Sequence, residues 1–367
     1  MFCKLKKLLV LNLSHNSLSL LTKSSSDISS NVAACPRLIF LGCSSCNITE
    51  FPNFLRTQED LQILDLSDNK IYGDIPKWAR DIGKDSLFNL NLSSNFLTGG
   101  LDILQWKKLD SIDLHSNMFE GPIPIPLPLT EGLLASNNSS LRTLDLNGNQ
   151  LEGLLPPSLL SCQGLEVLDM GNNNFNGTFP YRLGFLPKLQ VLIFCSNNFH
   201  GNIGTSKAKH PFSTLRIFDL SNNGFNSTLP SSLLYCFKAM MNSTEKIGKL
   251  QYLCNSYYKD SVILKVKGFD FKFSRILTVI TTIDVSNNKL EGEIPQAIGD
   301  LVSLRWLNLA HNNFTGRIPP SLVSLSELES LDLSSNMLEG QIPEEPASLT
   351  FFEFFNVSQN RLVGPIP

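Results

Sequence analysis

Leucine and asparagine recur along the chain in one register, L-x-x-L-x-L-x-x-N-x-L-x-G-x-I-P, where x is any residue. The register is clearest from Leu61, Ser303 and Glu327, and thirteen copies can be aligned, several of them 24 residues apart. Because strand side chains alternate between two faces, L-x-L predicts a short strand with buried leucines, and stacked copies predict a parallel sheet. A single copy cannot bury its apolar side chains alone, so we expect the copies to fold cooperatively against their neighbours.

One polar position of each copy is predicted to lie inside the protein, namely the asparagine that follows L-x-L. Its amide can donate to and accept from backbone groups that would otherwise be buried unpaired. We therefore expect a ladder of asparagines at Asn16, Asn69, Asn95, Asn117, Asn149, Asn173, Asn197, Asn223, Asn288, Asn312, Asn336 and Asn360. At Cys46 a thiol takes this position, and because a thiol is a weak donor, it predicts a weaker rung.

The G-x-I-P tail of each copy predicts an extended segment. Glycine permits a tight turn and proline fixes the backbone, so the tail leaves little room for a long helix. In this feature the chain resembles the plant extracellular leucine-rich-repeat class. The resemblance implies an α/β-type leucine-rich-repeat solenoid, a curved right-handed coil with a parallel sheet on the concave face, a second short strand per repeat and few helices.

The register is interrupted in two places. About nine repeats fill residues 1–234, with one irregular junction near 121–140, and four more fill residues 276–367. Between them, residues 235–275 abandon the repeat, and the alternation in DSVILKVKGFDFKF predicts a pair of strands around Gly268. We interpret this insertion as a surface excursion packed on the solenoid. The alternative is a binding loop carried by a rigid scaffold.

Charge and hydropathy narrow the kind of partner. The formal net charge is -3, and the 30 basic side chains are scattered, which argues against a nucleic-acid partner. No apolar run approaches the roughly 18 to 20 residues that span a bilayer, so we expect no membrane contact by this chain itself. The start, MFCKLKKLLVLNLSHNSL, fits the repeat register better than a signal peptide. We expect a protein, peptide or glycan ligand and predict no cofactor.

The outward strand positions form the expected contact surface. Aspartate fills the x of L-x-L in many copies, and we expect no structural role for the outward side chains of Asp65, Asp113, Asp145, Asp169, Asp219, Asp284 and Asp332. We interpret them as a feature of the repeat more than as ligand contacts. In the last four repeats the outward set changes to Arg305, Trp306, Asn308, His311, Phe354 and Asn356. Tryptophan beside arginine is typical of a binding anchor, although we favour lateral packing on the solenoid for Trp306.

Catalytic chemistry finds little support in the sequence, and we predict that the chain is not an enzyme. The five histidines show no metal-ligand or triad pattern, and we expect them on the surface. Cys43 and Cys46 have the C-x-x-C spacing of redox motifs, but the register places Cys43 at an inward leucine position and Cys46 on the ladder. Cys236 and Cys254 are candidates for a disulfide in an oxidising compartment.

Ten N-x-S/T sequons predict glycosylation if the chain is secreted. They lie at Asn12, Asn47, Asn91, Asn137, Asn138, Asn176, Asn226, Asn242, Asn313 and Asn356. Asparagine and serine are also repeat residues, so some sequons arise by coincidence, and we expect about half of them to be used.

A closer resemblance lies in and around the insertion. It is carried by F-K-A-M, Tyr257-Tyr258, Asp260-Ser261-Val262, Lys267-Gly268 and Arg275-Ile276-Leu277, followed by T-x-I-D-V-S-N-N-K-L-E-G-E-I-P. These phrases resemble the island region of plant receptor-like proteins, the group that includes the Cf-type and Verticillium-resistance receptors. That family has a signal peptide, capping segments, one membrane helix and a tail without a kinase. We recognise none of these parts in this sequence, which suggests a truncated receptor.

The resemblance implies a non-enzymatic extracellular recognition module that binds a pathogen-derived or endogenous ligand. It would signal through partner leucine-rich-repeat receptor kinases in plant defence, at the extracellular face of the plasma membrane. The ligand or co-receptor surface that it implies comprises Tyr257, Tyr258, Lys265, Lys267, Arg305, Trp306, Asn308 and His311.

Two alternatives stay open. The first is a soluble inhibitor of a microbial cell-wall-degrading enzyme, similar to the polygalacturonase-inhibiting proteins, which are shorter and have no island. The insertion at residues 235–275 therefore argues against it. The second is a nonfunctional truncated receptor remnant, which the unrecognised caps, signal and membrane helix favour.

Overall fold

The computed structural model describes residues 5–17, 36–101, 108–124, 141–204, 211–241, 251–253, 261–343 and 350–366. The chain divides into two compact units. Unit 1 contains Met1–Leu165 and Asn172–Asn174, and unit 2 contains Glu166–Gly171 and Phe175–Pro367. The division falls within the repeat that carries Asn173.

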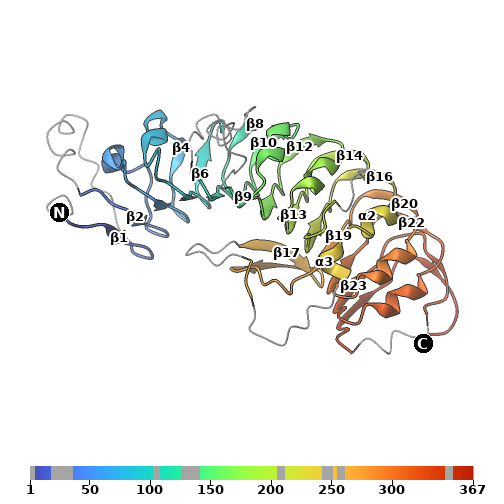
Figure 1. The fold of residues 1–367 in the computed structure, drawn as a ribbon. Helices are drawn as coiled ribbons and strands as arrows, with labels where there is room; N and C mark the ends of the chain where they lie inside the picture. Colours follow the sequence, from blue (N-terminus) through green and yellow to red (C-terminus); the bar gives the residue numbers. More distant parts are fainter. Residues whose placement is uncertain are drawn as a thin grey trace. The chain divides into compact units, whose positions relative to one another are not determined.

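The L-x-L segments form the short strands of a main parallel sheet in each unit (Figure 1). In unit 1 the order is β1 (Val10–Asn12), β2 (Phe40–Gly42), β3 (Ile63–Asp65), β5 (Asn89–Asn91), β7 (Ser111–Asp113) and β9 (Thr143–Asp145). In unit 2 it is β11 (Val167–Asp169), β13 (Val191–Ile193), β15 (Ile217–Asp219), β19 (Thr282–Asp284), β21 (Trp306–Asn308), β23 (Ser330–Asp332) and β25 (Phe354–Asn356). The central residue of each strand pairs with that of the next, as Leu64 with Leu90 and Leu307 with Leu331, and these leucines are buried. The predicted parallel solenoid sheet is confirmed.

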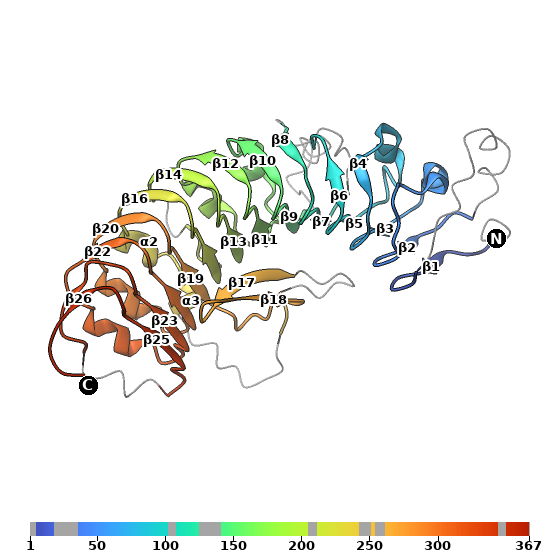
Figure 2. The same cartoon turned by 180° about the vertical axis from the view of Figure 1, so that it is seen from behind.

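From the copy of Asn69 onward, the residues that lead into the G-x-I-P tail form the predicted second strand, which ends near the tail glycine, as the view in Figure 2 also shows. These strands are β4 (Tyr72–Asp74), β6 (Phe96–Thr98), β8 (Glu120–Pro122), β10 (Gln150–Gly153), β12 (Asn174–Gly177), β14 (Asn198–Asn202), β16 (Gly224–Thr228), β20 (Lys289–Glu293), β22 (Asn313–Thr315), β24 (Glu339–Gly340) and β26 (Arg361–Leu362). The turn needs glycine, because Gly292 has φ +79° and an added Cβ would approach Thr228 Cγ2 to 2.9 Å.

The helices of the described chain are short, as the proline in each tail predicts. Most follow a proline directly: η3 (Asn53–Thr57), η4 (Lys77–Asp81), η6 (Pro157–Ser161), η7 (Tyr181–Phe185), η8 (Gln296–Asp300), η9 (Pro320–Ser324) and α2 (Ser231–Leu234), while α3 (Lys238–Met241) does not. Proline is tolerated at a helix start because its missing N–H would have no intrahelical partner there. Among the described residues, no helix is long and apolar enough to cross a membrane.

The asparagine ladder is confirmed by its hydrogen bonds. Asn69 Nδ2 donates to the carbonyl oxygens of Cys43, Leu66 and Ser67 at 2.8–3.0 Å, and its Oδ1 accepts from the N–H groups of Cys46 and Ile48. From Asn69 onward each amide thus ties its own turn to the preceding repeat, and buried backbone groups find partners that the short strands cannot supply. For Asn16 the predicted inward position is wrong, because this residue is exposed and its Nδ2 donates to Leu13 O and Ser14 O of its own turn. The Cys46 thiol takes over only the donor role, toward Leu13 O at 3.0 Å.

Candidate functional site

The insertion contributes an antiparallel hairpin, β17 (Val262–Val266) and β18 (Phe269–Phe273). Lys267 and Gly268 form the two-residue turn with φ of 54° and 84°, as a hairpin with the usual right-handed twist requires. The strand pair predicted around Gly268 is confirmed.

The hairpin packs against the main sheet in unit 2, on the face to which the outward strand positions point. Alternate β17 residues Val262, Leu264 and Val266 are buried, and they join a cluster with the sheet residues Val167, Val191, Ile193 and Ile217. On this face most other strands carry polar residues, whereas β11, β13 and β15 carry an apolar patch that the hairpin covers. The interpretation of the insertion as an excursion packed on the solenoid is therefore confirmed for the hairpin. Its buried apolar contacts fix its position on the sheet.

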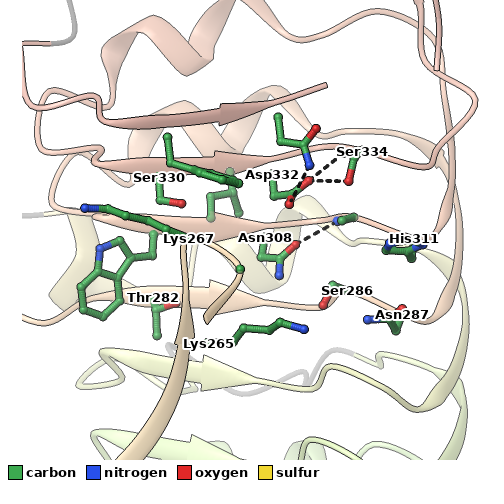
Figure 3. Close-up of a pocket in the computed structure, with 16 residues that line it drawn as sticks. Lys265, Lys267, Thr282, Ser286, Asn287, Asn308, His311, Ser330, Asp332 and Ser334 are labelled. Carbon is green, nitrogen blue, oxygen red and sulfur yellow. Dashed lines mark hydrogen bonds between the residues drawn. The ribbon is translucent and has the colours of Figure 1, made fainter. Parts of the chain in front are cut away.

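A hollow of about 320 Å³ lies beside the hairpin turn, over β19, β21, β23 and β25 (Figure 3). Lys265, Lys267 and Gly268 line it from the hairpin. The sheet contributes hydroxyl, amide, carboxylate and aromatic side chains: Thr282, Ser286, Asn287, Trp306, Asn308, His311, Ser330, Asp332, Ser334, Phe354 and Asn356. In Figure 3, Lys265 reaches over the sheet from the hairpin, and His311 lies near Asn287 at one side. The hollow therefore offers hydrogen-bond donors and acceptors next to two aromatic rings and two cations.

Trp306 is held in place from two sides. Its ring stacks on Phe273 of the hairpin with centroids 5.8 Å apart, and its Nε1 donates to Glu329 Oε2 at 3.1 Å. The neighbouring Arg305 pairs with Glu327 at 2.8 Å and with Glu329. The favoured lateral packing of Trp306 is confirmed. One part of its ring still lines the hollow, whereas the Arg305 guanidinium is held by two carboxylates and does not line it.

Carboxylates and amides alternate along the floor of the hollow. Asn308 Nδ2 donates to Asp284 Oδ2 at 2.9 Å, and Asn356 Nδ2 donates to Asp332 Oδ2 at 3.2 Å. Each strand-end carboxylate also accepts from the turn that follows it, as Asp332 Oδ1 does from Ser334 N and Oγ. The expectation that these outward side chains have no structural role is wrong, because the oxygen of a residue at this position reaches the N–H two residues further on.

Two acidic side chains meet without an intervening amide where β15 pairs with β19. Asp219 and Asp284 are both buried and lie opposite each other in the register. Burial, followed by the nearby Asp284 carboxylate, raises the pKa of Asp219 to about 8, and burial also raises the pKa of Asp284. One proton is thus retained by this pair at neutral pH, since two adjacent buried carboxylates resist full ionisation.

Replacing Asp219 with asparagine is expected to stabilise unit 2 at alkaline pH. Folding raises the pKa of Asp219 from 3.8 to about 8. The contribution of this group to the free energy of unfolding is therefore fully present below about pH 4 and is lost as the pH rises through 8. The amide of Asp219→Asn does not ionise, so the variant avoids this loss. We expect its free energy of unfolding to exceed that of the unmodified chain by about 2 kcal/mol at pH 8, with little change at pH 4. Asparagine can keep the turn contact, because Asn91 and Asn356 accept from the serine two residues on in the same way.

Thermal melts of the secreted protein between pH 4 and pH 8 test this expectation. Asp65→Asn is the matched control, because Asp65 makes the same contact to Ser67 while its neighbouring strands carry Gly42 and Asn91. An equal pH-dependent gain in both variants would contradict the role of the acid pair.

Five of the residues predicted for the ligand or co-receptor surface come together at the hollow: Lys265, Lys267, Trp306, Asn308 and His311. Arg305 lies next to them, and Tyr257 and Tyr258 fall outside the described residues. The small polar residues Thr282, Ser330 and Ser334 were not predicted. The sequence carried a signal for Thr282 and Ser330, since both occupy the same outward position as Trp306 in the adjacent repeats. Ser334 lies in the turn after β23 and has no counterpart among the predicted residues.

The sequons differ in exposure. Asn12, Asn47, Asn176, Asn226 and Asn313 are exposed, whereas Asn137, Asn138 and Asn242 lie outside the described residues. Asn356 is half-buried and bonded to Asp332. Asn91 corrects the prediction: it is 8% exposed and its Oδ1 accepts from Ser93 N and Oγ, so its amide cannot receive a glycan in the folded protein. The exposed sequons stay predicted glycosylation sites.

The cysteines carry no sign of redox chemistry in the described part of the chain. Burial raises the pKa of Cys43 to about 12, which keeps its thiol protonated, and Cys46 is fully buried on the ladder. The Cys236 thiol is free and donates to Ser232 O at 3.1 Å, while Cys254 lies outside the described residues.

His115 corrects the expectation of surface histidines, because it is buried between two aspartates.

Comparisons with known proteins agree with this architecture. A leucine-rich-repeat family model matches residues 60–81, 214–236, 280–301, 303–325 and 327–349, and a model of two leucine-rich repeats matches residues 139–182. Receptor-like protein 18 of Arabidopsis thaliana is 40% identical over 327 residues, which cover 82% of this chain and 39% of the relative. Receptor-like protein 53 of the same plant is 39% identical over 347 residues, which cover 83% of this chain and 35% of the relative. The chain thus spans well under half of the length of these relatives.

Solved structures show the same fold. The crystal structure of a TDR receptor matches with a TM-score of 0.70 at 24% identity, covering all of this chain and 58% of the receptor chain. The structure of PEPR1-AtPEP1 matches with a TM-score of 0.63 at 26% identity, covering 92% of this chain and 47% of that chain.

Proposed function

Because this chain belongs to the leucine-rich-repeat receptor-like proteins of plants, we propose that it is the ligand-recognition part of an extracellular receptor. We further propose that the hollow beside hairpin β17–β18 receives the ligand. The observation that carries this proposal is the joining of hairpin and sheet residues in one open hollow of mixed polar and aromatic lining. Such a lining is typical of recognition by binding, and the proposed role requires no catalysis.

The chemistry of the hollow fits a protruding part of a peptide, protein or glycan. About 320 Å³ is at the small end of the range for ligand clefts, so it would hold a side chain or a sugar unit and not a whole protein. Trp306 and Phe354 offer ring faces, and Asn308 and Ser330 offer directional hydrogen bonds beside them. Lys265 favours a ligand that carries acidic or hydroxyl oxygens, whereas the Lys267 ammonium is paired with the Glu353 carboxylate.

The biological setting is proposed from the family. The relatives are named receptor-like proteins, and PEPR1 was solved together with AtPEP1, so ligand binding by a related solenoid has a structural precedent. We propose that the receptor acts in plant defence at the extracellular face of the plasma membrane. Leucine-rich-repeat receptor kinases would serve as its signalling partners, with Arg305 and its surroundings as part of the contact surface.

Removing the two polar groups that reach into the hollow from opposite sides is expected to weaken ligand binding. The purified chain, secreted from plant cells, would be screened against synthetic peptides and cell-wall oligosaccharides. Lys265→Ala and His311→Asn should each weaken a captured ligand about tenfold, which corresponds to about 1.4 kcal/mol. The asparagine keeps the left-handed backbone, since His311 has φ 53° and Asn287 holds the same conformation one repeat earlier.

Lys289→Ala is the control, because Lys289 is an exposed lysine on β20, outside the lining of the hollow. Undiminished binding in both hollow variants would move the ligand site elsewhere on the chain. Binding lost equally in the control would instead indicate a general effect of surface charge.

A further inference from the structure

A mixed cluster of metal-ligating side chains lies on the outer face of unit 1, apart from the hollow in unit 2. Asp113 and Asp145 lie opposite each other at the ends of β7 and β9, and His115 follows Asp113 by two residues. His115 Nδ1 is 2.6 Å from Asp113 Oδ1 and 3.7 Å from Asp145 Oδ2. One ligand atom from each of the three residues lies within 4.8 Å of the others.

The histidine is a departure from the repeat that the turn itself does not require. In several other repeats a serine holds this position and its Oγ donates to the strand-end aspartate, as Ser67 does to Asp65 and Ser221 to Asp219, at 2.6–2.7 Å. The His115 ring keeps the contact to Asp113 through Nδ1, and it brings a second nitrogen, Nε2, that a serine does not have. The substitution therefore supplies ligand chemistry beyond what the turn needs.

The two adjacent carboxylates of the cluster also favour a bound cation. Asp113 and Asp145 are adjacent acids on neighbouring strands, as Asp219 and Asp284 are in unit 2, where a proton is retained. In unit 1 the imidazole stands between the two carboxylates. A cation at this point would balance two nearby negative charges in a partly desolvated place.

We propose that Asp113, His115 and Asp145 bind a divalent transition metal of the zinc class. One imidazole nitrogen and two carboxylate oxygens are ligands that zinc accepts, and three protein ligands leave the fourth tetrahedral position to water. The side chains are 10%, 14% and 9% exposed for His115, Asp113 and Asp145, so the cluster is enclosed yet reachable. Bonds of about 2.0–2.2 Å need only a modest opening of the His115–Asp113 contact, with the metal lying between the two atoms.

The sequence alone did not reveal the cluster, because its ligands come from two repeats separated by an irregular junction and meet only when β7 pairs with β9.

Equilibrium dialysis and titration calorimetry with zinc chloride test the proposal on the full secreted chain after chelator treatment. We expect one zinc ion per chain at this site, and a thermal transition that rises with zinc. His115→Ser introduces the serine that several other repeats carry, so it should fold normally in the absence of metal yet bind zinc at least tenfold more weakly. His200→Ser, at an exposed histidine on β14, is the matched control and should bind as the unmodified chain does.

Asp145→Asn is a second variant that keeps the shape of the side chain and removes one charged ligand, and it should weaken zinc binding in the same way. The proposal is overturned if the unmodified chain binds no zinc, because His115 then acts only as a counter-cation for the two acids. It is equally overturned if His115→Ser and Asp145→Asn both bind zinc as tightly as the unmodified chain.

Discussion

Replacing Leu309 with aspartate is expected to abolish secretion of folded protein. Leu309 is fully buried directly after β21, and its backbone N–H and carbonyl already bond to Asp332 O and Asn336 Nδ2 of the next repeat. The carboxylate would have no partner in this apolar layer and could not turn outward without breaking the register. The loss of leucine packing costs about 2–5 kcal/mol, and the unpaired charge adds several more. Together these terms approach the total of about 5–15 kcal/mol that stabilises a typical domain.

Secretion yield and circular dichroism of the product measure this effect. Leu154→Asp is the matched control, since Leu154 is 65% exposed and the same substitution there should leave secretion intact. Leu309→Met separates volume from charge and should cost less than about 1.5 kcal/mol. Normal folding of Leu309→Asp would mean that the repeat register assigned to unit 2 is wrong.

The repeat, its two strands and the asparagine ladder could be predicted because they are local and periodic. Each depends on residues a few positions apart, and neighbouring copies supply the same environment to each other. The aspartates show where such reasoning fell short. Their outward direction follows from strand alternation, but the contact from Asp332 Oδ1 to Ser334 N depends on the turn after the strand, which the alternation does not describe.

The candidate site was predicted only in part, because it depends on contacts that cross the repeats. The alternation in β17 indicates which of its residues are buried, but not which strands they cover. The position of the hairpin is set by an apolar patch of one or two residues per repeat, which includes Val191 and Ile217 and lies far from Leu264 in sequence. The stacking of Trp306 on Phe273 and the capture of Arg305 by two glutamates likewise depend on contacts that the sequence pattern does not describe.

The ladder predicts the second large effect: Asn312→Ala should destabilise unit 2 by about 3 kcal/mol. Asn312 Nδ2 donates to the carbonyls of Val285, Leu309 and Ala310, and its Oδ1 accepts from Leu290 N at 3.0 Å. The three carbonyls keep other donors, whereas the Leu290 N–H would be left without its acceptor in a buried place. One orphaned backbone donor costs about 1–3 kcal/mol, and the lost amide bonds and side-chain volume add to it.

The natural thiol at Cys46 provides the graded test of this argument. Its Sγ donates to Leu13 O and Ser44 O as an asparagine would, but sulfur is a poor acceptor. Asn312→Cys should therefore fall between Asn312→Ala and the unmodified chain in urea and thermal melts. In the reverse direction, Cys46→Asn should stabilise unit 1. If alanine and cysteine at position 312 proved equally harmful, the donor bonds would contribute nothing measurable, and the acceptor for Leu290 would account for the whole effect of the ladder residue.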